Sequence, residues 1–182
     1  MKKLTCALCV LFLLGLLTAC GDEVADDPNL SEEAKALVEE VGGPFSESEF
    51  EKFMADLPEI PNITVESRKN MGEVSGEALS AQILSAVEEQ GWEKERFMYI
   101  YSHAMTMMGM QQMETMNTQM QAQMEDMPEE QKKMMEQMLA QQMGGQMEAY
   151  KAEVDKQIPA SEQAIIMDNM DDLCTAFGVQ KQ

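Results

Sequence analysis

Beyond the first thirty residues, apolar side chains recur every three or four positions, which is the spacing of one face of an α-helix. No stretch longer than a few residues alternates with period two. The pattern therefore predicts an all-α fold, a small bundle of about six helices. Its apolar faces are Ala34, Leu37, Val38 and Val41; Phe50, Phe53, Met54 and Leu57; Leu79, Ile83, Leu84 and Val87; Phe97, Ile100 and Tyr101; and Ile165, Ile166, Met170, Leu173 and Phe177.

Capping and breaking residues set the expected ends of several of these helices. Ser31 is a good N-cap for the first helix, and Gly42-Gly43 stops it. Ser46 or Ser48 begins the second helix, and Ser161 caps the last one.

The fourth helix begins around Trp92 and runs into a methionine-rich tract, residues 105–147. This tract holds 14 of the chain's 20 methionines, and Leu139 is its only other large apolar residue. At about 100° per residue, seven of these methionines fall on one stripe about 140° wide, as in an amphipathic helix with methionine in the place of leucine. The seven are Met105, Met110, Met113, Met116, Met120, Met124 and Met127.

The tract also contains the signals of a turn. Asp126-Met127-Pro128 marks an end and a new start, because proline is tolerated in the first turn of a helix. Gly144-Gly145 predicts a kink or break, after which the apolar pattern resumes through Tyr150 and Val154. Two methionine stripes joined by a short turn predict an antiparallel helical hairpin. The second stripe consists of Met134, Met135, Met138, Leu139 and Met143.

The methionine stripes allow two structural interpretations and a functional one. Methionine favours helices and fills irregular space, so the stripes fit a core face. The Gln/Met-rich low complexity also fits a partly disordered tract. As a function, adaptable thioethers suit the binding of apolar peptides or proteins. Oxidation of methionine is compatible with each of these. The residues expected to make the partner-binding surface are Met113, Met116, Met120, Met124, Met127, Met134 and Met138.

A second functional interpretation is Cu(I) binding, because thioethers are suitable ligands for a soft monovalent ion. His103, Met107 and Met110 have i, i+4, i+7 spacing on the flank of the main stripe, so one imidazole and two thioethers would offer three ligands. A single helical histidine more commonly makes a polar contact at the edge of a core. Copper handling is therefore the alternative to partner binding, and no other cofactor is expected.

The first residues have the pattern of an export signal. Lys2 and Lys3 precede an uncharged apolar run, residues 4–17. Fourteen residues of helix rise about 21 Å, which is short of the roughly 30 Å of a membrane's hydrocarbon core. The run is therefore expected to be a signal that is removed, rather than a permanent span.

The tetrapeptide Leu17-Thr18-Ala19-Cys20 resembles the lipobox of bacterial lipoproteins. This resemblance covers only the leader. It implies that Cys20 carries the lipid and becomes the new N-terminus after cleavage. With Gly21 and Asp22 following, it further implies a bacterial envelope protein that is delivered to the outer membrane and faces the periplasm.

These features divide the chain into a signal peptide (1–19), an acidic flexible tether (20–30) and a single helical domain (31–182). Cleavage removes Cys6 and Cys9, whose spacing would elsewhere suggest a redox or zinc site. Cys174 lies in an apolar helical pattern, and we expect it to be a small core residue.

Charge and motif content narrow the function further. The chain has 33 acidic and 13 basic residues, and its net charge of −20 argues against a nucleic-acid partner. It has one histidine and no Walker loop, Gly-x-Ser-x-Gly or His-Glu-x-x-His motif, which favours a non-enzymatic role. The sequence thus predicts a lipid-anchored, non-enzymatic envelope protein.

The lipid anchor is testable at one residue. Acyl chains contribute about 0.8 kcal/mol per buried CH₂, so two or three chains hold a protein on a membrane. Cys20→Ala should therefore abolish incorporation of labelled fatty acid and move the protein to the soluble fraction. If the variant still incorporates the label and fractionates like the parent, the lipoprotein interpretation is wrong.

Overall fold

The computed structural model describes residues 24, 27–61, 63–64, 76–125, 127–134 and 145–179. Every regular element among them is helical, which confirms the all-α prediction. Within these residues, no helix is both long and apolar enough to cross a membrane. The elements are α2 (Glu32–Glu40), α3 (Glu47–Asp56), the 3₁₀ helix η1 (Leu57–Glu59), α5 (Gly76–Glu89), α6 (Lys94–Glu125), α8 (Gln146–Gln157), α9 (Ala160–Asp168) and α10 (Met170–Ala176).

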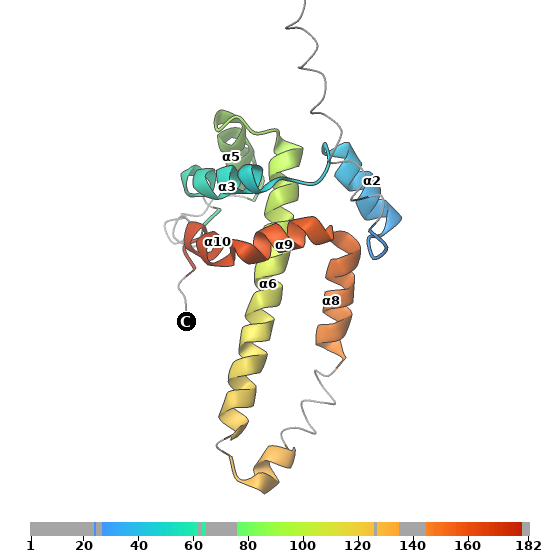
Figure 1. Cartoon of the computed structure of the whole chain (residues 1–182). Coiled ribbons are helices and arrows are strands. Elements are labelled where there is room, and N and C mark those ends of the chain that lie inside the picture. Colours follow the sequence, from blue (N-terminus) through green and yellow to red (C-terminus); the bar gives the residue numbers. More distant parts are fainter. Residues whose placement is uncertain are drawn as a thin grey trace, which may run out of the picture.

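The helices form a head from which a long hairpin projects (Figure 1). The head contains α2, α3, η1, α5, α9, α10 and residues 94–110 of α6. The hairpin consists of residues 111–125 of α6, the helical turn within residues 127–134, and α8, which returns beside α6. The two arms meet closely near the head, where a Cβ on Gly109 would lie 3.8 Å from the hydroxyl of Tyr150. With 32 residues, α6 is about 48 Å long and belongs to both parts.

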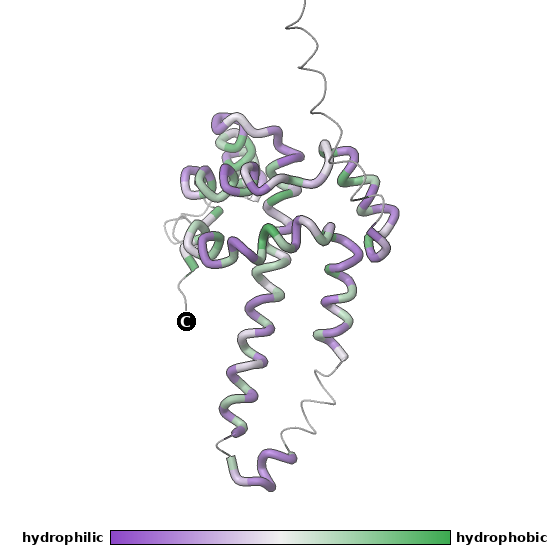
Figure 2. The backbone as a smooth tube through the Cα atoms, viewed as in Figure 1, coloured by the Kyte–Doolittle hydropathy of each residue, from purple (hydrophilic) through white to green (hydrophobic). Residues whose placement is uncertain are grey.

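The core of the head is built around aromatic side chains. Phe50, Phe53 and Phe97 have no exposed surface. The ring of Phe53 lies 5.1 Å from that of Phe97, which also contacts Trp92 at 5.9 Å between ring centroids. Tyr101 lies 6.4 Å from Phe97 and 5.8 Å from Phe177, the residue after α10, between ring centroids. These contacts join α3, α6 and α10 into one apolar cluster, and Figure 2 shows the most hydrophobic part of α6 inside the head.

Two predicted helix starts are confirmed. The Ser31 hydroxyl accepts a hydrogen bond from the N–H of Ala34 at 3.2 Å, and that of Ser46 accepts one from Glu49 N–H at 3.3 Å. Between these helices, Gly42 and Gly43 adopt φ angles of 98° and 95°, which residues with a Cβ rarely do. Gly43 N–H donates to the carbonyl of Val38, so the glycines end α2 as the sequence predicts.

The predicted last helix is two helices, and its expected cap is wrong. Pro159 occupies the N-cap position, so Ser161 lies inside α9. Asp27 supplies the missing cap from a distant part of the chain, because its Oδ2 accepts a hydrogen bond from Ala160 N–H at 3.2 Å. Asn169 then separates α9 from α10, and its side chain donates to the carbonyl of Ile165.

Residues 27–30, predicted to belong to a flexible tether, contact the body instead. Leu30 is buried in the core, and Ser31 N–H donates to the carbonyl of Lys156 at 2.9 Å. One predicted core position is also wrong, because Leu37 is 47% exposed although Val38 beside it is buried. The N-terminal segment is thus held where α8 joins α9, at the root of the hairpin.

Candidate functional site

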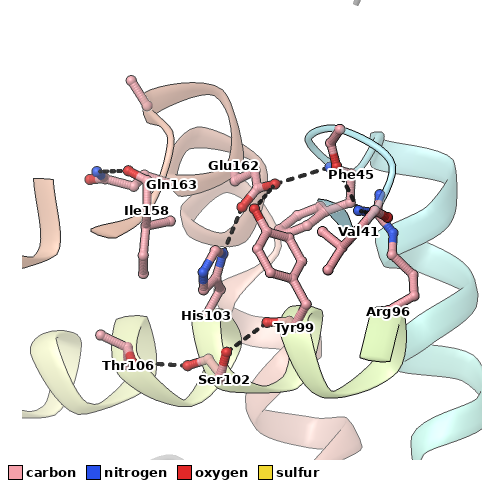
Figure 3. A network of polar contacts seen from close by, with 12 residues as sticks. Val41, Phe45, Arg96, Tyr99, Ser102, His103, Thr106, Ile158, Glu162 and Gln163 are labelled. Atoms are coloured by element: carbon pink, nitrogen blue, oxygen red, sulfur yellow. Dashed lines mark hydrogen bonds and ion pairs between the residues drawn. The ribbon is translucent and has the colours of Figure 1, made fainter. Parts of the chain in front are cut away.

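A fully buried carboxylate lies where three parts of the head meet. Glu162, in the first turn of α9, has no exposed surface. Its Oε1 accepts hydrogen bonds from Phe45 N–H at 3.1 Å and from the Tyr99 hydroxyl at 2.8 Å. Its Oε2 lies 2.7 Å from His103 Nδ1. We call these four residues the Glu162 clamp (Figure 3).

The clamp joins segments that are far apart in sequence. Tyr99 and His103 are four residues apart on α6, so both side chains leave the same face of that helix. Their rings lie 4.2 Å apart between centroids. Phe45 belongs to the loop between α2 and α3, and Glu162 follows α8 after a short turn. Both arms of the hairpin are therefore fixed to each other at their root.

A second charged group stabilises the loop beside the clamp. Arg96 Nε and Nη2 each donate to one carboxylate oxygen of Glu49, both at 2.7 Å. Its Nη1 donates to the carbonyls of Val41 and Gly43 at 3.2 and 2.6 Å. The guanidinium thereby bonds to carbonyls left free at the end of α2 and links the α2–α3 loop to α6.

These contacts shift two pKa values. The hydrogen bond to Glu49 raises the pKa of Arg96 above its ordinary value, against the opposing effect of burial. Burial raises the pKa of Tyr99 well above its ordinary value of 10.0, and the negative charge of Glu162 adds to the shift. No buried side-chain nitrogen or oxygen among the described residues lacks a hydrogen-bond partner. The clamp is thus a satisfied buried network, closed to solvent, which fits a structural role.

The three predicted copper ligands all lie in or against this core. His103 makes the polar contact that a lone helical histidine commonly makes, here to Glu162. Met107 and Met110 are 1% and 6% exposed and belong to the head's apolar cluster. Among the described residues, no group of three or more His, Cys, Asp or Glu side chains is arranged to hold a metal.

The predicted partner-binding methionines differ strongly in exposure. Met116 and Met134 are 59% and 69% exposed, and Met113, Met120 and Met127 are half-buried. Met124 is buried, although it lies outside the head's cluster. Within the head, the stripe residue Met110 is buried and Met105 is 40% exposed, and along the hairpin the stripe is partly open surface. Met138 and the lipidation residue Cys20 lie outside the described residues.

Sequence reasoning did not identify Glu162, Arg96 or Glu49 as functional or structural centres. Their partners lie 47 to 117 positions away along the chain, so no local motif reveals them. One signal was present. Glu162 lies four residues before Ile166, on the same face of α9, so a carboxylate occupies an apolar register of that helix.

Comparisons of the chain with protein-family models, with curated protein sequences and with solved structures give no match. The site is therefore interpreted from its own geometry.

Removing the buried carboxylate should strongly destabilise the head. Glu162→Ala leaves three donors without an acceptor and should lower the free energy of unfolding by about 3–5 kcal/mol. Tyr99→Phe removes one donor and should cost about 1–2 kcal/mol. Urea denaturation of both variants gives the comparison. Glu162→Gln is the matched control, because an amide keeps an acceptor for Phe45 and Tyr99. Equal losses for Glu162→Ala and Tyr99→Phe would show that the carboxylate does not organise the network.

The raised pKa of Tyr99 predicts a loss of stability in alkali. Above its ordinary pKa of 10.0, the unfolded chain loses the phenol proton while the folded protein keeps it. The unfolded state then binds fewer protons, so stability is intact below that pH and falls above it, by at most about 1.4 kcal/mol per pH unit. Urea titrations between about pH 9 and pH 11 should show a shallower fall for Tyr99→Phe than for the parent. Parallel curves would contradict the assignment.

Proposed function

We propose that this protein is a lipid-anchored lipoprotein of the bacterial envelope whose projecting hairpin binds apolar segments of peptides or proteins. Its role is non-enzymatic, and the methionines along the hairpin provide the contact surface. The anchor rests on the lipobox-like sequence ending at Cys20. The binding role rests on the hairpin.

The observation that supports binding is the change in exposure along one continuous helix. Residues 94–110 of α6 bury seven side chains, including Met107 and Met110. From residue 111 to 125 the same helix buries only Met124, and Met116 is open to solvent. A stripe that served only as core would be covered along its whole length. Here the methionine pattern continues for about 22 Å beyond the head, at about 1.5 Å per residue.

The threonine hydroxyls on either side of Met116 are hydrogen-bonded within their own helix, so they do not require polar groups from a binding partner. The hydroxyls of Thr115 and Thr118 donate to carbonyls of their own helix, at 2.9 and 3.0 Å. Glu114 is the only charged residue between positions 105 and 124. The surface offered by this stretch is therefore made of thioethers and uncharged amides. Flexible, polarizable methionine side chains adapt to apolar partners of different shape.

The net charge of the protein selects among such partners. At −20, the chain repels acidic segments and attracts basic ones at long range. We therefore assign as partner an amphipathic helical segment, with one apolar face and with basic residues on its other face. Such a segment would pack its apolar face along the hairpin.

The lipid would hold the protein by its head. Asp27 is fixed to the start of α9, and it lies seven positions after Cys20. A chain of seven residues reaches at most about 25 Å, so the root of the hairpin stays within that distance of the lipid. The hairpin extends from the head and is free to meet partners near the membrane.

Cu(I) handling, the alternative function, has less support. Glu162 occupies Nδ1 of His103, and the two thioethers of the predicted site are packed in the head. The alternative stays a prediction, and competition with a Cu(I) chelator would test it.

The binding surface can be tested with the full chain carrying Cys20→Ala. The probe is a labelled peptide with leucines on one helical face and lysines on the other. Replacing Met113, Met116 and Met120 by Gln removes apolar surface and should weaken peptide binding at least about tenfold, or about 1.4 kcal/mol. Fluorescence anisotropy measures the affinity, and circular dichroism checks that helicity is kept.

The matched control replaces Met98 and Met105 by Gln. These residues lie on the same helix and are exposed, but they belong to the head. This variant should bind the peptide like the parent. Absence of binding by the parent, or loss of cooperative unfolding in the hairpin variant, would identify the stripe as core.

A further inference from the structure

The hairpin presents the most exposed methionine side chains among the described residues. Met134 and Met116 are 69% and 59% exposed. The next group, Met98, Met105 and Met167, is about 40% exposed and lies in the head. At the other extreme, the four buried methionines Met107, Met110, Met124 and Met170 are each less than 9% exposed.

We propose that Met116 and Met134 form a reversible oxidation site, which reacts with peroxides or hypohalous acids before any other methionine of the described residues. Oxidation there turns the apolar surface of the hairpin polar while the head stays folded. The location of the site is independent of the proposed function. Its effect on partner binding rests on that function.

The chemistry is a two-electron oxygen transfer. A sulfur lone pair attacks the terminal oxygen of a peroxide, the O–O bond breaks, and the leaving hydroxide takes a proton to become water. The thioether is oxidised to a sulfoxide and the peroxide is reduced. With hypochlorous acid the leaving group is chloride. Methionine sulfoxide reductases reverse the change, so the site can switch in both directions.

The head is protected from the same reaction. Met107 and Met110 lie in the apolar cluster, and an oxidant reaches them only after the head opens locally. Opening at this point would also break the contact of His103 with Glu162. Cys174 is half-buried and packs against the same cluster.

Oxidation of methionine has different effects on folding in the head and on the hairpin. A sulfoxide is polar, and in a core it would destabilise the fold. On the open hairpin it keeps its contact with water, so folding is little affected. The apolar surface around Met116 is lost, because the sulfoxide is polar. The hairpin thereby loses affinity for apolar segments without unfolding.

The first measurement maps oxidation along the chain. The full chain carrying Cys20→Ala is treated with hydrogen peroxide for increasing times, digested, and analysed by mass spectrometry. Met116 and Met134 should be oxidised about tenfold faster than Met107 and Met110, with Met98 and Met105 in between. Far-ultraviolet circular dichroism should stay unchanged during the first phase. Equal rates at all methionines, or faster reaction at Met98 and Met105, would overturn the site.

The second measurement tests the change of surface. Peroxide should lower binding of the uncharged dye Nile red to the parent. Met116→Leu together with Met134→Leu keeps both positions apolar and removes both oxidisable sulfurs, so this variant should keep its dye binding after peroxide. Met98→Leu with Met105→Leu is the matched control and should lose binding like the parent.

Loss of dye binding in the Met116/Met134 variant would overturn the proposed switch. Failure of the untreated parent to bind the leucine–lysine peptide would count against the proposed function alone, because the oxidation map does not depend on a partner.

Discussion

The structure depends on one buried carboxylate. Glu162 has no contact with solvent, and its charge is compensated by donors from a loop and from α6. Burying a carboxylate is costly unless every lone pair finds a partner, so this position tolerates few alternative arrangements of its neighbours. Because Tyr99 and His103 lie on α6, which continues into one arm of the hairpin, and Glu162 follows α8, the other arm, the clamp sets where the hairpin leaves the head. The aromatic cluster supplies buried apolar surface, and the clamp fixes the positions of α6, α9 and the α2–α3 loop relative to one another.

The same constraint separates two uses of methionine on a single helix. Near the clamp, α6 is surrounded by α3, α9 and α10, and its thioethers fill space in the core. Helix α6 also contacts α8, which lies outside the head. Met116 is exposed to water, whereas Met107, a residue of the same type on the same helix, is buried. Accessibility decides whether a thioether packs, binds a partner or is oxidised, and Met107 and Met116 differ in accessibility along one helix.

The sequence determined much of this arrangement locally. The N-caps Ser31 and Ser46 and the glycines at 42 and 43 were predictable, because each acts through bonds to residues within five positions. The cap of α9 was not predictable, because Asp27 reaches it from more than a hundred residues away. The exposure of Leu37, and the difference in exposure among the methionines of the stripe, could not be predicted because they also depend on distant parts of the chain. Periodicity identifies a face, whereas the number of neighbouring helices decides how far along its length that face is covered.

The most direct test of this account is native-state hydrogen exchange of the backbone amides of α6. If the clamp fixes the head and the hairpin projects from it, residues 97–110 should exchange only by near-global unfolding. Residues 113–125 should exchange through a local opening of much lower free energy, and Glu162→Ala should lower protection at 97–110 most. Uniform protection along all of α6 would contradict the account, because it would mean that the methionine stripe is core throughout.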